Sequence, residues 1–126
     1  MALMLPVHVG PTGAAARDAM RPGVLKYYQN LQTIFSQLPE SYGDHVPRLR
    51  MIEETVTNLP YEKFCREQGV FGDAAEVIDR LQAARDEFEL SQIICWFDQG
   101  SMLPRAEVER TMREFAGQVM PKLAAA

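Results

Sequence analysis

His8 is the first side chain whose type and position could support chemistry. It lies near the end of the apolar segment 2–9, ALMLPVHV. An imidazole titrates near neutral pH and can act as a general acid or base. In barrels of parallel strands the active site lies at the carboxyl ends of the strands, which makes His8 a candidate site residue. The alternative is a core or loop histidine that bonds to the backbone.

Trp96 and Asp98 end the second apolar segment, residues 90–97 with the sequence LSQIICWF, and its following loop. Because side chains alternate along a strand, Trp96 and Asp98 share one face and Phe97 takes the other. An inward Trp96 could line a cofactor or substrate pocket, and Asp98 could contact the ligand at the rim. The alternative is that Trp96 belongs to the core and Asp98 caps a loop.

The other reactive side chains show no catalytic or metal-binding spacing. His8 and His45 have no carboxylate or thiol at ligand spacing, so no metal site is expected. The sequence contains neither a Gly-rich phosphate loop nor a G-x-S-x-G elbow. Cys65 and Cys95 form no C-x-x-C pair, and we expect two reduced thiols in the cytoplasm. His45 follows an acid in a polar turn and is expected to be exposed.

Composition limits the remaining function classes. The chain has 126 residues, of which 47% are hydrophobic and 24% charged, as in one globular domain over 1–126. Its 13 Lys and Arg against 17 Asp and Glu give a formal charge of -4. An acidic chain without a basic cluster is a poor match for nucleic acid. No apolar segment approaches the length of a membrane span, and the start lacks the basic region of a signal peptide. We therefore expect a cytoplasmic protein that binds neither nucleic acid nor membrane.

The elements that position these side chains begin with a strand and two helices. The continuous apolar character of residues 2–9 predicts a strand covered on both faces. Thr12 can cap a helix that runs to Met20. Pro22 then interrupts that helix, or restarts it as a first-turn proline. Apolar residues three and four apart predict that the second helix extends to Leu38.

A helical insertion at about 39–69 follows. Its longer helix, preceded by Asp44, has one apolar face formed by Leu49, Ile52, Val56 and Leu59. A short helix over 61–68 ends at Gly69. Residues 70–72 are apolar but too short to assign by themselves.

Asp73 and Glu76 form a D-x-x-E capping box, which predicts the start of a helix. Residues 90–97 predict a second strand, rich in Ile and aromatic residues. Pro104 then starts a last helix, which Pro121 is expected to end.

Strands alternate with helices, and this order predicts an α/β fold with a parallel sheet. An eight-unit barrel takes about 250 residues, or about 31 per unit, so the chain without its insertion amounts to roughly three βα units. Such a sheet has two open edges. It also has an uncovered apolar face, for which we expect Leu3, Leu5, Ile94 and Trp96. Open edges recruit further strands, so we expect a homo-oligomer.

Three motifs follow one another in residues 70–123. The first, G-[DST]-x-x-E-V-x-x-x-L, starts at Gly72; the second is an apolar strand that ends in an aromatic residue and Asp98; the third, F-x-x-x-V-M-P, starts at Phe115. In this order and spacing they resemble the C-terminal end of the bacterial luciferase-like flavin-dependent monooxygenases. The start of the chain is similar to a late strand of that family, with Ala15 where the family has glutamate.

The resemblance implies about the last three βα units of a (β/α)8 TIM barrel. Such enzymes use FMN or a related reduced flavin or deazaflavin, with O2, to oxidise a small organic substrate. Their flavin phosphate and ring are held mainly by earlier and middle strands, so no flavin-binding residue is carried over to this chain. We therefore expect the isolated chain to be inactive and to bind flavin weakly, with His8, Trp96 and Asp98 as candidate pocket residues.

Two functions follow from these expectations. In the first, the chain is part of a monooxygenase and a further polypeptide supplies the missing strands. In the second, it is a non-catalytic, self-associating barrel remnant with a binding or structural role. A neighbouring reading frame that encodes the missing strands would favour the first.

Overall fold

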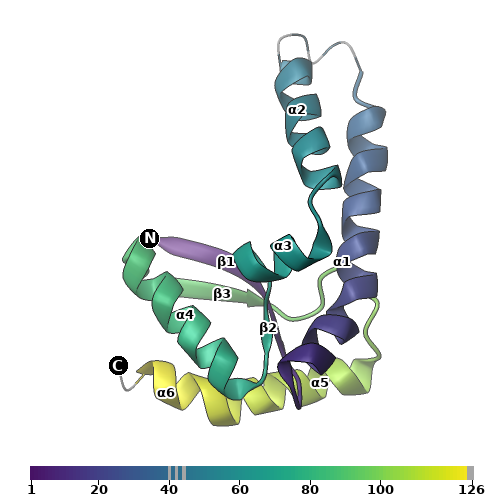
Figure 1. Cartoon of the computed structure of the whole chain (residues 1–126). Coiled ribbons are helices and arrows are strands. Elements are labelled where there is room, and N and C mark those ends of the chain that lie inside the picture. The colour runs from purple at the N-terminus through teal and green to yellow at the C-terminus, as the bar shows by residue number, and fades with distance from the viewer. Residues whose placement is uncertain (40, 42, 44, 125–126) are drawn as a thin grey trace.

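The computed structural model describes residues 1–39, 41, 43 and 45–124, and for residues 52, 53 and 55–57 it describes the backbone alone. Figure 1 shows an α/β body from which two helices extend side by side. In chain order the elements are β1 (Ala2–Val9), α1 (Gly13–Ser36), α2 (His45–Thr57), α3 (Tyr61–Glu67), β2 (Val70–Gly72), α4 (Ala74–Phe88), β3 (Gln92–Trp96), α5 (Arg105–Glu114), the π-helical turn η2 (Phe115–Val119) and α6 (Met120–Ala124).

The three strands form one parallel sheet in the order β2-β1-β3. β2 pairs with the last part of β1, from Val7↔Val70 to Val9↔Gly72. β3 pairs with the first part, from Ala2↔Gln92 to Pro6↔Trp96. The predicted α/β class and parallel sheet are therefore confirmed, and the unassigned residues 70–72 form a buried strand.

The strand order differs from the one that consecutive barrel units produce. In such units each strand pairs with the next along the chain, which would place β2 in the centre. Here β1 is central, with β2 and β3 on opposite edges. The three residues of β2 pair with the end of β1 on one edge, and the five residues of β3 pair with the first part of β1 on the other edge.

Helices cover both faces of the sheet. On one face, Val7, Val9 and Val70 pack against α4 and η2. On the other face, Phe71 packs against α1 and α3. Strands covered on both faces read as continuous apolar segments, which explains the pattern in residues 2–9.

The amino-terminal half of the sheet is covered less completely. Met4 and Ile94 are register partners on one face, and they are 56% and 48% exposed. Leu3 and Leu5 are only half-exposed, because strand alternation turns them to the other face, where Leu5 packs against the core. Trp96 is half-buried. The prediction of an uncovered face is therefore correct for Ile94 and wrong for Leu3 and Leu5, while Trp96 lies on the same face as Ile94 but is half-buried.

α1 is one helix, where the sequence predicted an interruption at Pro22. Pro22 lies inside the helix and is exposed, and so is Asp18, whose carbonyl lacks a helical donor because of the proline. Met20 and Val24, on either side of it, are both buried in the core with α3. This packing stabilises the two halves as one helix. The predicted cap is confirmed, since Thr12 Oγ1 accepts from Ala15 N–H at 3.1 Å.

The last helix also continues beyond its predicted end at Pro121. α5 passes through η2 into α6, where Pro121 is the second residue. A proline clashes with the carbonyl four residues before it, here that of Gly117. Gly117 lies in η2, where Met120 N–H bonds to Phe115 O, five residues back. This wider turn is the local change that lets the helix continue.

The capping box before α4 is confirmed. Glu76 N–H donates to Asp73 Oδ1 at 2.9 Å, and Asp73 N–H donates to Glu76 Oε2 at 3.0 Å. In α2, His45 is the exposed first residue, as expected. Asp44 and the side chains of Ile52 and Val56, part of the predicted apolar face of that helix, lie outside the described residues.

Candidate functional site

His8 is the penultimate residue of β1 and is completely buried. Its register partner is Phe71, so the ring lies on the face of the sheet that α1 and α3 cover. Within the described part of the chain, neither ring nitrogen has a hydrogen-bond partner. A buried polar group in this state is costly and is often found at functional positions.

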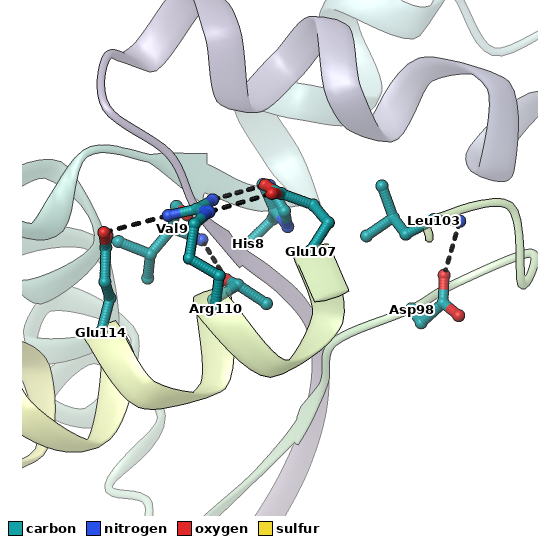
Figure 2. Close-up of polar contacts among 8 residues, drawn as sticks. His8, Val9, Asp98, Leu103, Glu107, Arg110 and Glu114 are labelled. Carbon is teal, nitrogen blue, oxygen red and sulfur yellow. Dashed lines mark hydrogen bonds and ion pairs between the residues drawn. The ribbon is translucent and has the colours of Figure 1, made fainter. Parts of the chain in front are cut away.

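The carboxylate of Glu107, on α5, lies beside the His8 ring. Its Oε1 is 3.4 Å from His8 Nε2, which is ion-pair distance without hydrogen-bond geometry. Arg110 holds the same carboxylate through two bonds, from Nη2 to Oε1 at 2.5 Å and from Nε to Oε2 at 2.9 Å. Arg110 Nη1 also lies 3.0 Å from Glu114 Oε1, so one guanidinium joins two carboxylates (Figure 2).

Arg110 also links α5 to the end of β1 by a hydrogen bond. Its Nη2 donates to the Val9 carbonyl at 2.8 Å. The buried hydroxyl of Thr111 accepts from Val9 N–H, also at 2.8 Å. β3 pairs with β1 only as far as Pro6, so these two side chains satisfy backbone groups beyond the reach of β3. α5 thereby closes the carboxyl end of β1.

Burial and the neighbouring charges set the protonation of this cluster. Burial lowers the pKa of His8 below its usual 6.5; Glu107 opposes this shift, and the charge of Arg110 adds to it. The hydrogen bonds from Arg110 hold the pKa of Glu107 below its usual 4.5, against the effect of burial. The same bonds raise the pKa of Arg110. At neutral pH the cluster therefore contains a neutral imidazole, an ionised carboxylate and a cation.

A neutral imidazole beside an ionised carboxylate has the composition of a general base and the group that orients it. The side chain of His8 is only 1% exposed, however, so no substrate reaches the ring in this arrangement. Proton transfer to a ligand would require α1 or α5 to move. In the isolated chain the cluster joins α5 to the sheet.

Trp96 and Asp98 lie outside the His8 cluster. Trp96 packs edge-to-face on Tyr27 of α1, with ring centroids 5.2 Å apart. Asp98 Oδ1 accepts from Leu103 N–H at 3.3 Å and so caps the loop after β3, turned away from His8 in Figure 2. The rings of Phe97 and Phe115 pack edge-to-face, with their centroids 5.2 Å apart.

Three pockets of about 540, 620 and 360 Å³ open on the described part of the chain. His8, Trp96 and Asp98 line none of these three. That they line a ligand pocket therefore stays a prediction.

Sequence reasoning missed Glu107, Arg110 and Glu114. Their spacing of three and four places them on one helix face, which is a signal readable in the sequence. It does not reveal that this face turns toward a buried histidine. Gln99 was missed as well; it is 3% exposed, and its Oε1 has no partner among the described residues.

No protein-family model matches the chain, and no curated protein matches it. Across the described ranges, no helix is both long and apolar enough to cross a bilayer. In the same residues, no three His, Cys, Asp or Glu side chains gather as metal ligands would.

Lowering the pH from about 7 to about 5 should destabilise the protein, with His8 carrying much of the loss. Because the pKa of His8 is lower in the folded chain, the unfolded chain takes up the proton first, and stability falls as the pH drops below about 6.5. The pKa of Glu107 is also lowered, but its contribution is lost only below about 4.5.

Thermal unfolding midpoints across this pH range measure the effect. We expect His8→Leu to flatten the dependence, while His45→Leu, which changes the exposed histidine of α2, keeps it. If the unfolding midpoint falls equally with pH in the parent and both variants, His8 is not the source of the pH dependence.

Proposed function

We propose that the chain is the C-terminal part of a luciferase-like flavin-dependent monooxygenase. The rest of the barrel comes from a longer polypeptide or from a second chain. When bound, the reduced flavin would supply the reaction of O2 with a small organic substrate. The proposal is supported by the three motifs in residues 70–123 and by the parallel α/β arrangement of the elements that contain them.

The observation that carries the proposal is the pair of unsatisfied side chains near the carboxyl ends of β1 and β3. His8 and Gln99 are both buried, and polar atoms of both have no partner among the described residues. In parallel α/β folds, ligand sites lie at this end of the sheet. A ligand bound at this end of the sheet would give these atoms their partners, with a movement of α1 or α5 that opens a path to His8.

The residues present do not form a flavin site by themselves. The His8 side chain is buried, Trp96 packs on Tyr27, and Asp98 caps its own loop. FMN or a related flavin or deazaflavin would therefore depend on strands outside this chain.

The proposal includes an exchange of strand partners. In a barrel, the preceding strand pairs with β1 on the edge opposite β2, and β3 pairs with β2. In the isolated chain β3 takes that opposite edge, along Ala2–Pro6. β3 would move to the free edge of β2 when the preceding strand is supplied.

The non-catalytic alternative has its own support, because Met4 and Ile94 leave an apolar surface on one face of the sheet. Full burial of such a side chain contributes about 1.5–3 kcal/mol, and Met4 and Ile94, which are about half exposed, lose roughly half of that. We expect the isolated chain to form a dimer or higher oligomer through this face or through the sheet edges. Light scattering at micromolar concentration measures it. A monodisperse particle of 14.2 kDa that unfolds cooperatively would contradict both incompleteness and self-association.

Flavin binding tests the enzyme proposal and separates it from the alternative. A completed barrel should bind flavin at micromolar concentration or below, whereas the isolated chain should not. A self-associating remnant binds flavin in neither state.

A further inference from the structure

A second charged cluster lines the pocket of about 540 Å³ between α1, α3 and α4. Four arginines contribute to it: Arg17, Arg21, Arg66 and Arg80. The chain as a whole has a formal charge of -4 and only 13 Lys and Arg, so this is a local concentration of positive charge. Two carboxylates, those of Asp18 and Glu62, also line the pocket and leave it with a net positive charge.

Among the described residues, one of the four arginines has a carboxylate partner. Arg21 Nη1 lies 3.7 Å from Glu62 Oε1, and its guanidinium lies 5.1 Å from the Tyr61 ring centroid. In the parts of the chain that the structure describes, Arg17, Arg66 and Arg80 have no carboxylate at ion-pair distance. Unpaired cations in one hollow repel one another, and an anion between them would relieve that repulsion.

Arg80 is held in place by neutral groups. Its Nη1 donates to the Gly69 carbonyl, and its Nη2 donates to the Arg66 carbonyl at 3.0 Å. Burial is the largest cause that lowers the pKa of Arg80, and the charge of Arg17 adds to the shift, whereas Cys65 and the more distant carboxylate of Glu76 oppose it. The guanidinium is thus fixed and partly desolvated without a counter-charge in contact, as in a preformed anion site.

The opposite wall of the pocket is rigid and weakly polar. Tyr61 and Cys65 of α3 are 9% and 6% exposed. The Tyr61 hydroxyl donates to the Arg17 carbonyl, which fixes α1 against α3. A volume of this size accommodates a whole small molecule rather than a single inorganic ion.

We infer that this pocket binds the phosphoryl group of a small phosphorylated molecule, with Arg17 and Arg80 as its main ligands. A phosphoryl group carries more charge and more acceptor oxygens than one carboxylate, and guanidinium forks match its geometry. The overall negative charge of the chain disfavours an extended polyanion such as a nucleic acid.

Calorimetric titration of the full chain with pyrophosphate and with inorganic phosphate tests it, at an ionic strength fixed with sodium chloride. We expect saturable binding of one anion per chain, with pyrophosphate the tighter. Arg17→Gln should weaken binding about tenfold or more, the effect of one charge-assisted hydrogen bond. Arg105→Gln is the matched control, because that side chain is 93% exposed and pairs with Glu109 on α5.

Arg80→Gln also removes bonds to two carbonyls, so its unfolding midpoint is measured alongside binding. Arg80→Lys keeps the charge and should retain more of the affinity than Arg80→Gln at comparable stability. Absence of saturable binding for both anions would overturn the inference. Equal weakening by Arg17→Gln and Arg105→Gln would also overturn it, since that result indicates diffuse electrostatic attraction.

Discussion

Gly100→Ala should destabilise the fold by about 3 kcal/mol or more, the largest effect we expect from a single methyl group. Gly100 has a φ of +85°, a conformation that side chains rarely adopt. A Cβ at this position would overlap the carbonyl oxygen of Gly23 and lie 2.7 Å from its Cα. These are backbone atoms of α1, so the clash can be relieved only by moving the helix away from the loop after β3.

Chemical denaturation of Gly100→Ala and Gly117→Ala measures the effect. Gly117 lies in η2 with open space around it, so Gly117→Ala should be neutral or stabilise the helix by up to about 1 kcal/mol. A loss below about 1 kcal/mol in Gly100→Ala would show that α1 does not pack on this loop as described.

Arg110→Met should cost about 2 kcal/mol, the second largest effect. The variant keeps most of the aliphatic stem but removes the donor to the Val9 carbonyl and the cation between Glu107 and Glu114. The guanidinium is about one-third exposed, so solvent screening keeps the ion-pair part of this loss small. Most of it comes from the unpaired carbonyl at the end of β1.

The same variant should raise the pKa of His8. The positive charge of Arg110 lowers the pKa of His8 directly. Arg110 also offsets the negative charge of Glu107, and that charge raises the pKa of His8. An NMR titration of the His8 ring protons in the parent and the variant measures the shift. Arg105→Met, on the exposed side of α5, should leave the pKa of His8 unchanged. An unchanged or lower His8 pKa in Arg110→Met would contradict the described cluster.

Local features of the fold could be predicted because their causes lie within a few residues. The Thr12 cap and the Asp73–Glu76 capping box each depend on hydrogen bonds between residues three apart. The strands at residues 2–9 and 90–97 were recognised from their apolar side chains, although β3 is shorter than predicted.

The strand order and the continuation of α1 through Pro22 depend on packing between distant residues. β3 pairs with the edge of β1 opposite β2, a long-range pairing that no local pattern reveals. α1 continues through Pro22 because Met20 and Val24 are buried against α3, some forty residues further along the chain. Propensity alone favours a break at such a proline.

The candidate site was predicted in part. The position of His8 near the end of an apolar strand indicated a site residue, and the structure buries it without a hydrogen-bond partner among the described residues. Its neighbours could not be predicted, because Glu107 and Arg110 lie about one hundred residues away in the sequence. From the sequence alone, the charged face of α5 is indistinguishable from a solvent-exposed face, because the sequence does not show that it covers the end of β1.

Flavin titration of the completed assembly tests the proposed function directly. The chain is mixed with a polypeptide that carries about five preceding strands of the barrel, and FMN binding is followed by fluorescence. We predict saturable binding near or below about 1 μM for the mixture and none for either component alone. The same weak binding by the mixture and by its components would contradict the proposal, as would tight binding by this chain alone.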